Sequence, residues 1–164
     1  MISYSSPRAG SHDTADAEPD PLRDLSYDGK QDGGRMKKGL GQLTDGRFGP
    51  DDLSLDTSRD GHRWVGWLND TLGGQPLEIT FEFEAVREFF TVHLHVSNAL
   101  SRGVKRSPVH ATVPPSGPEE QVSVTTDASR NITVPLLSRV GRFVRLQLHF
   151  AAPLILLSEV SFES

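Results

Sequence analysis

The sequence predicts an all-β domain, an antiparallel β-sandwich or jelly roll of about eight strands. Apolar and polar residues alternate over several short segments, which is the period of a strand with one buried face. Glycine and proline, 15 and 11 of the 164 residues, separate these segments. No segment carries an apolar stripe of helical period. A chain of this length has enough material for one sizeable core, so we expect a single domain over residues 1–164.

The clearest strand signals lie in the second half of the chain. Residues 77–84 alternate strictly, with Leu77, Ile79, Phe81 and Phe83 on one side. A second alternation over residues 90–96 places Phe90, Val92, Leu94 and Val96 on the expected buried face. Further strands are expected at residues 2–5, 122–125, 131–137, 142–150 and 154–162. Residues 8–24 are rich in Asp, Pro and Ala and poor in large apolar groups, which predicts a flexible, exposed acidic loop.

Composition excludes several classes of function. The formal net charge of -5 disfavours a general nucleic-acid surface or a polybasic membrane patch. Cysteine is absent, which removes disulfides, thiolate catalysis and cysteine-ligated zinc. No apolar run is long enough to span a bilayer, and the first residues lack the pattern of a secretory signal, so we expect neither segment in this chain.

Catalytic and zinc motifs are also weak. No nucleophile elbow or paired catalytic motif marks any serine, histidine or acid, so we expect no catalytic site in this chain. His93 and His95 share one strand face, which is compatible with zinc, but no third ligand is identifiable and a solvated face is the favoured interpretation. Arg102, Lys105 and Arg106 are interpreted as a solvated loop, with a weak polyanion contact such as heparin as the alternative.

One glycine-rich run, residues 39–46, offers oxygen donors to a cation. It places Gln42 and Asp45 among closely spaced glycines, and Ser158 and Glu159 add two more donors near the far end of the chain. Hard oxygen ligands of this kind suit calcium. The alternative is an ordinary capped turn with a surface carboxylate. From these residues alone, both interpretations stay open.

Two sequons and two tryptophans are candidates for surface roles. Asn69 and Asn131 each begin an Asn-x-Thr tripeptide and are candidate N-glycosylation sites. Trp64 and Trp67 offer a possible sugar-binding platform, although tryptophan in a β-sandwich more often packs in the core.

Several motifs together carry a family resemblance. They are residues 2–7, Tyr27-Asp28-Gly29, the run 39–46, Asp51-Asp52, Val65-Gly66-Trp67, Phe81-Glu82-Phe83 and residues 158–162. In order and spacing they resemble the discoidin-like domain of discoidin domain receptors, the second extracellular module of these collagen-activated receptor tyrosine kinases. The resemblance spans nearly the whole chain, and residues 8–24 and 101–130 are the least alike.

The resemblance implies a jelly roll with one structural calcium ion. The implied ligands are the side chains of Gln42 and Asp45, the carbonyl of Arg47, main-chain oxygens of His62 and Trp64, and Ser158 and Glu159. The family places one further ligand, an asparagine, where this chain has Arg23; a carbonyl, a water or Asp24 would have to replace it. Leu146 stands at a half-cystine position of the family, and Asn69 matches a glycosylated one.

The function implied by the resemblance is that of a non-catalytic, calcium-stabilised extracellular module. It would orient the neighbouring collagen-binding domain of a single-pass receptor at the outer side of the plasma membrane and contribute to collagen-triggered signalling. Collagen would be bound only through that neighbour, and a receptor dimer is compatible with this arrangement. The alternative is a carbohydrate- or glycan-binding β-sandwich, because fold does not fix function.

Overall fold

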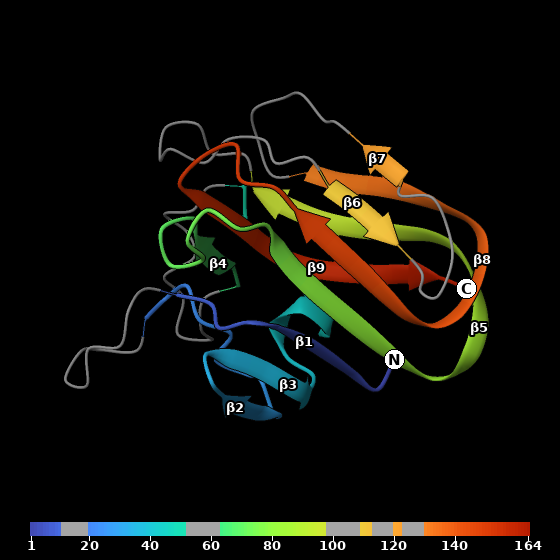
Figure 1. The fold of residues 1–164 in the computed structure, drawn as a ribbon, viewed down its shortest axis with the longest axis horizontal. Coiled ribbons are helices and arrows are strands. Elements are labelled where there is room, and N and C mark those ends of the chain that lie inside the picture. Colours follow the sequence, from blue (N-terminus) through green and yellow to red (C-terminus); the bar gives the residue numbers. More distant parts are fainter. Residues whose placement is uncertain (11–19, 52–62, 98–108, 113–119, 123–129) are drawn as a thin grey trace.

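The computed structural model describes residues 1–10, 20–51, 63–97, 109–112, 120–122 and 130–164. Over these residues the chain forms nine strands and one 3-10 turn, η1 (Gln42–Thr44), as Figure 1 shows. Every strand pairing is antiparallel. The all-β antiparallel fold class predicted from the sequence is therefore confirmed.

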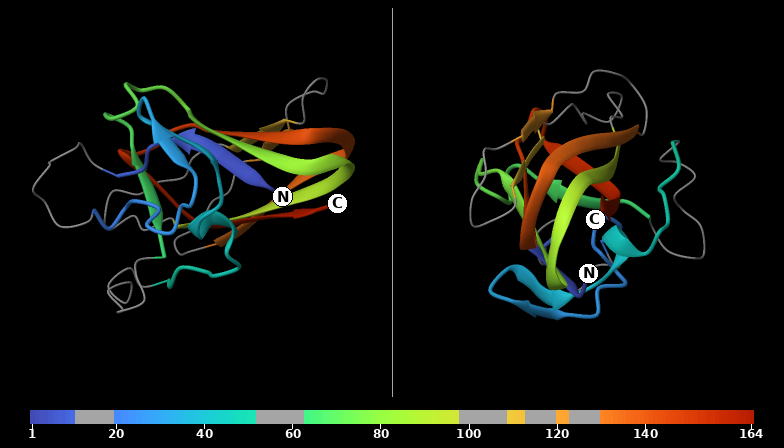
Figure 2. Two further views of the ribbon diagram at one scale, coloured as in Figure 1. Left: turned by 90° about the horizontal axis from the view of Figure 1, so that it is seen from below. Right: turned by 90° about the vertical axis from the view of Figure 1, so that its right-hand side faces the viewer.

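Two long strands, β5 (Leu77–Ser97) and β8 (Arg130–Leu148), are the backbone of the fold. They pair along most of their length. On its other edge β5 pairs first with β1 (Ser3–Pro7) and later with β9 (Leu154–Glu163). Because these two partners lie on either side of a bend in β5, the sheet curls over itself (Figure 2).

Shorter strands extend this curled sheet. The strand order is β2-β3-β1-β5-β8-β6-β7, and β4 joins through β9. The short strands are β2 (Lys30–Asp32), β3 (Arg35–Gly39), β4 (Val65–Leu68), β6 (Val109–Thr112) and β7 (Glu120–Val122). No helix of the described residues is long and apolar enough to cross a bilayer.

The core fills the space inside the curl. The inward residues of β5 at 77, 79, 81 and 83 are buried, as their alternation predicts. They meet inward residues of β8 and β9 and one aromatic side chain of β4. The main members of this core are Tyr4, Trp67, Phe81, Phe89, Leu94, Val144, Leu146, Leu148, Leu157 and Val160.

The predicted face of residues 90–96 is wrong at its first member. Phe89 is fully buried, whereas Phe90 is 47% exposed. The cause is a shift in the β5–β8 register. Phe89 lies opposite Arg139 and Thr91 opposite Pro135, so that one intervening residue of β5 faces three of β8, and Phe90 turns outward. Val92 and Leu94 then regain the inward face, as predicted.

The strand boundaries also differ from the prediction. Residues 77–84 and 90–96 belong to one continuous strand, and so do 131–137 and most of 142–150. Leu137 and Ser138 have positive φ angles of 53° and 57°, which bend β8 without ending it. The predicted strand at 122–125 is found at 120–122, and residues 123–129 lie outside the described part of the chain.

The predicted exposed loop at 8–24 is buried at both ends. Ala9 is 2% exposed because it joins the core, and Asp24 is 4% exposed with its carboxylate bonded to the Tyr4 hydroxyl and the Gln42 backbone amide. Residues 11–19, the centre of that segment, lie outside the described residues.

Leu146→Ala tests the core at the position where the family has a half-cystine. Leu146 is fully buried and lies opposite Ile79 of β5. Removing its side chain should lower the free energy of unfolding by about 3 kcal/mol, because the cavity cannot close completely. Urea unfolding measures the loss. The matched control, Leu137→Ala, removes a side chain that is 58% exposed and should cost far less. Equal losses would contradict the assigned core.

Candidate metal site

The glycine-rich run brings the start of the chain against its end. After β3 the chain makes the η1 turn and continues past Asp45 to lie beside β9. There the Gly46 amide donates a hydrogen bond of 2.9 Å to Oε2 of Glu159. Glu159 itself is held by β-pairing with His95 of β5. The loop is thus joined to the terminal strand through a carboxylate.

Asp45 and Glu159 lie close enough to repel each other. Burial raises the pKa of Glu159 to about 7, and the charge of Asp45 adds to the rise, while the amides of Gly46 and Arg47 oppose it. Asp45 is exposed, and its Oδ1 accepts a 2.9 Å hydrogen bond from the Arg47 amide. Two carboxylates placed in this way attract a cation, because a shared positive charge removes their repulsion.

Gln42 and Ser158 hold the loop at two points. Oε1 of Gln42 accepts a 2.8 Å hydrogen bond from the Leu25 amide. Oγ of Ser158, which is fully buried, accepts a 3.0 Å hydrogen bond from the Gly49 amide. Both residues lie where the resemblance implies ligands, and both also have a structural role.

Asp24 holds the same loop through hydrogen bonds of its buried carboxylate. Its buried carboxylate accepts hydrogen bonds from the Tyr4 hydroxyl, from Ser26, and from the Gln42 amide at 3.0 and 3.1 Å. A Cβ at Gly41 would lie 2.3 Å from Oδ2 of Asp24, so only glycine fits that position. Burial and the charge of Asp24 raise the pKa of Tyr4 well above its ordinary value, which keeps the hydroxyl a donor.

These contacts bear on the substitution at Arg23. Asp24 is occupied by the loop amide and two hydroxyls, so it is a positioning residue for the loop and not the replacement ligand. Sequence reasoning missed this role. The signal was present as Asp24-Leu25-Ser26, because an aspartate bonds readily to the backbone two residues further on.

The three remaining implied ligands, which would contribute main-chain oxygens, are Arg47, Trp64 and His62. Arg47 is exposed on the loop, and Trp64 enters the core with its Nε1 donating to the Pro50 carbonyl at 3.2 Å. His62 lies outside the described residues, as do Arg102, Lys105 and Arg106. Trp67 is also buried, and its Nε1 donates to the Pro7 carbonyl at 2.9 Å. Neither tryptophan forms an exposed platform.

His93 and His95 have separate partners. His93 lies 3.3 Å from the Glu163 carboxylate and 2.9 Å from the Thr133 hydroxyl. His95 contacts Asn131 at 2.7 Å and stacks on Trp64. In the part of the chain that the structure describes, no three His, Asp or Glu side chains gather as a metal site. A cation at Asp45 and Glu159 would therefore need neutral oxygens as its other ligands.

The two sequon asparagines lie on different elements. Asn131 is exposed on β8, and its Oδ1 is the atom that contacts His95. Asn69 starts the turn after β4 and is partly exposed.

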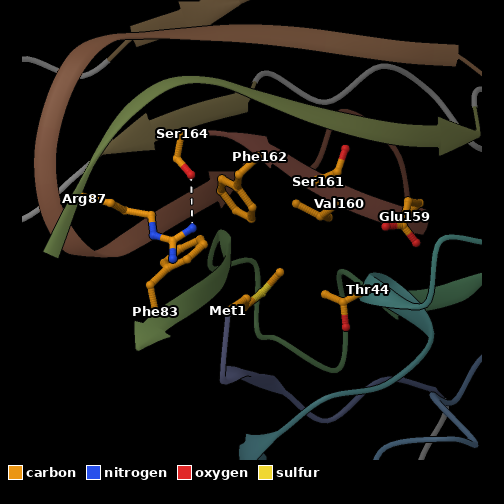
Figure 3. Close-up of a pocket in the computed structure, with 9 residues that line it drawn as sticks. All are labelled: Met1, Thr44, Phe83, Arg87, Glu159, Val160, Ser161, Phe162 and Ser164. Carbon is orange, nitrogen blue, oxygen red and sulfur yellow. Dashed lines mark hydrogen bonds between the residues drawn. The ribbon is translucent and has the colours of Figure 1, made fainter. Parts of the chain in front are cut away.

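Glu159 is reachable from solvent through a small cavity. The cavity has a volume of about 240 Å³. Figure 3 shows Glu159 and Thr44 at one end, and Arg87 stacked over Phe83 at the other. It is lined by Met1, Thr44, Phe83, Arg87, Glu159, Val160, Ser161, Phe162 and Ser164. Glu159 is therefore a lining residue of a cavity that also contains the guanidinium of Arg87.

The donor set fits calcium better than a transition metal. It consists of two carboxylates, an amide oxygen and a hydroxyl, all hard oxygens, whereas the nearby imidazoles are engaged elsewhere. Such an arrangement can hold a cation between loop and strand.

Comparison with known proteins identifies relatives of this chain. Residues 1–164 match the family described as Discoidin domain-containing receptor 1/2, DS-like domain. Epithelial discoidin domain-containing receptor 1 of Rattus norvegicus is 36% identical over 157 residues, and that of Homo sapiens 33%. Discoidin domain-containing receptor A of Caenorhabditis elegans is 33% identical over 137 residues. The matches cover 87%, 87% and 79% of this chain but 17% of each relative.

Solved structures show a more distant likeness. The CBM32 of AlyQ in complex with 4,5-unsaturated mannuronic acid has a TM-score of 0.48 at 15% identity, covering 74% of this chain and 83% of that one. The GH31 CBM32-2 bound to GalNAc has a TM-score of 0.48 at 20% identity, covering 77% and 87%. At this level the ligands of those proteins say nothing about a ligand of this chain.

Asp24→Ala tests the anchor beneath the loop. The substitution leaves the backbone amide of Gln42 and the Tyr4 hydroxyl, both buried, without their acceptor. This should lower the free energy of unfolding by about 3 kcal/mol. Asp32→Ala is the control, because that carboxylate is 79% exposed and only contacts Lys37. Urea unfolding of both variants measures the difference. A loss no greater than that of the control would refute the anchoring role.

The raised pKa of Glu159 predicts a pH dependence without calcium. The folded state holds the Glu159 proton more tightly than the unfolded state, so this residue stabilises the fold most below pH 4.5. That contribution should be lost as the pH rises from 4.5 to about 7. Urea unfolding in chelator at several pH values should show a shallower decline for Glu159→Gln than for wild type. Parallel profiles would contradict a buried, proton-retaining Glu159.

Proposed function

Since the chain belongs to the DS-like domain family of discoidin domain-containing receptors 1 and 2, a family of non-catalytic modules, we propose that it is a calcium-stabilised extracellular part of such a receptor. Its role is to hold a neighbouring collagen-binding domain in a fixed orientation at the outer face of the plasma membrane. In this role it contributes to collagen-triggered signalling. Kinase activity belongs to another part of the parent receptor.

The approach of Asp45 to Glu159 is the observation that supports the calcium proposal most strongly. These carboxylates lie 114 positions apart in the sequence, and the charge of Asp45 contributes to the raised pKa of Glu159. Gln42 and Ser158 lie beside them with oxygens of the kind calcium prefers. Arg47, Trp64 and His62 complete the proposed ligand set through main-chain oxygens.

The proposed ion has a structural role. Extracellular modules bind calcium with dissociation constants of about 0.1–1 mM, so millimolar calcium adds only about 1 kcal/mol. Its effect is concentrated where the glycine-rich loop meets β9. Losing the ion leaves two carboxylates that repel each other. The contact between the loop and β9 then loosens first, whereas the core is little affected.

Carbohydrate binding is less well supported. It depended on Trp64 or Trp67 forming an exposed aromatic surface, and both indoles are at most 2% exposed. Asn69 and Asn131 remain proposed glycosylation sites, which would place glycans on the turn after β4 and on the outer face of β8.

Asp45→Ala and Glu159→Ala test the metal proposal. Wild type should melt a few degrees higher in millimolar calcium than in chelator, because about 1 kcal/mol of binding shifts the Tm by that amount. Each variant should lose this calcium-dependent shift. Asp51→Ala, on the same loop, should keep it. Differential scanning calorimetry with and without calcium measures the shift, and identical wild-type melting curves would identify the loop as an ordinary turn.

Collagen binding distinguishes this module from its proposed neighbour. The 164-residue chain alone should not bind triple-helical collagen tightly, because the proposed role is to position a separate collagen-binding domain. A solid-phase assay with immobilised collagen and this chain measures it. Tight, saturable binding would overturn the division of roles and place the ligand surface here.

A further inference from the structure

The hairpin of β2 and β3 concentrates positive charge on an acidic chain. Figure 1 shows these two strands at one edge of the domain. Residues 30–38 contain four basic side chains and one carboxylate, that of Asp32. We call the four basic residues, Lys30, Arg35, Lys37 and Lys38, the basic hairpin. When the preceding Asp28 is included, four basic and two acidic groups give this stretch a net charge of +2, whereas the whole chain has -5.

The backbone of the hairpin fixes the positions of these side chains. Gly33 and Gly34 form the two-residue turn between the strands, with φ angles of 56° and 73°. Positive angles at both positions are those that the tightest hairpin turns need. β3 also pairs with β1 on its other edge, so the hairpin continues the main sheet. The basic groups are therefore held on a framework of paired strands.

The strand register places like charges opposite each other. Lys30 lies opposite Lys37, which is unfavourable in an antiparallel strand pair. The Asp32 carboxylate contacts Lys37 at 3.4 Å. In the part of the chain that the structure describes, Lys30, Arg35 and Lys38 form no ion pair. The described carboxylates therefore leave most of the positive charge of the hairpin unneutralised.

A bulge in β3 exposes two successive lysines. The β1–β3 register shifts between Tyr4 and Ser6, where one residue of β1 faces two of β3, Lys37 and Lys38. Both lysines are exposed, although successive residues of a strand normally point to opposite faces. Lys38 has a φ angle of 58°, in the left-handed region that favours glycine. The fold thus holds a lysine in a strained conformation, and such strain is concentrated at functional positions.

Protection of the sheet edge explains only part of this charge. Lysines on an edge strand prevent unwanted pairing with another chain, and β2 is the edge strand at this end of the sheet. β3, however, lies between β2 and β1, so both of its edges are already paired. Three of the four cations, Arg35, Lys37 and Lys38, belong to β3. A negatively charged ligand accounts for these three.

We propose that the basic hairpin binds a linear sulfated polysaccharide of the glycosaminoglycan class. One sulfate group bridges Lys30 and Lys37 and removes their repulsion. The Arg35 guanidinium offers parallel N–H donors to a second anionic group of the same polymer. Alternate residues of a strand repeat about every 7 Å, so the cations form an extended row that matches an extended polymer. The inference rests on the extracellular location proposed above, where such polymers occur.

An anionic membrane fits this surface less well. Peripheral attachment to lipid combines basic groups with apolar side chains that enter the interface. Met36, the large apolar residue of the hairpin, is 2% exposed and cannot do so without unfolding the strand pair. The strongly negative surface potential of cell membranes also belongs to the cytoplasmic leaflet, and the proposed location is on the other side.

Surface plasmon resonance with immobilised heparin tests the site. Wild type should bind at about 50 mM salt and about tenfold or more weakly at about 200 mM, because ionic contacts are replaced by counterions. Lys37→Gln with Lys38→Gln should weaken binding about tenfold. Arg139→Gln with Arg145→Gln removes the same charge from β8 and should bind like wild type. No binding by wild type at the lower salt concentration, or equal losses in the two variants, would overturn the proposal.

Lys38→Gly separates ligand binding from folding. Because glycine adopts a φ angle of 58° without strain, this variant should melt at a higher temperature than wild type and yet bind heparin more weakly. Unchanged heparin binding would contradict a role for the Lys38 side chain. The assay is run in chelator, so its result is independent of the calcium-dependent melting shift that tests the proposed function.

Two further probes distinguish other sources of binding. Desulfated heparin should not bind, because the hairpin contacts sulfate groups. Binding that persists in the Lys37→Gln, Lys38→Gln variant would place the contact elsewhere, for example at residues 102–106, and would overturn the proposal. Binding of wild type to phosphatidylserine vesicles but not to heparin would overturn it as well.

Discussion

The antiparallel pairing of β5 with β8 is the interaction on which the rest of the domain depends. It joins residues that are between 34 (Val96 and Arg130) and 71 (Leu77 and Leu148) positions apart in the sequence, and it continues through a bend in both strands. On one side of the bend β5 also pairs with β1, and on the other side it pairs with β9. This one pair of long strands thus contributes to both layers of the domain, and the aromatic and aliphatic residues between the layers form one core.

The loop that carries Gln42 and Asp45 is held by this framework from two directions. Asp24 fixes its backbone from within, and Glu159 reaches its amides from the last strand. Asp24 also explains one of the glycines of the loop, because at Gly41 any side chain would collide with the Asp24 carboxylate. The loop is therefore ordered by buried acids, with the proposed ion as an addition to that order.

Much of the fold was predictable because it rests on period-2 alternation. Residues 77–83 follow that period and lie where it predicts. Residues 154–160 form the strand that their apolar run predicts, and the family resemblance is confirmed by the comparisons. Phe90 was predicted wrongly because a bulge leaves no composition signal in an apolar segment. The strands β2, β3 and β4 were missed because they are too short to show a period. The convergence of Asp45 and Glu159 came from the resemblance, whereas the anchoring by Asp24 depends on tertiary packing that spacing does not reveal.

The first and last residues of the chain lie at the same end of the domain, near the bend of the paired strands β5 and β8 (Figures 1 and 2). Met1 and Ser164 even line one cavity. Polypeptide attached at either residue would therefore leave the domain in the same neighbourhood. In a longer protein the two neighbouring segments would therefore attach at the same end of this domain, and most of the domain would lie to one side of them. A rotation of the domain would then change the angle between these segments.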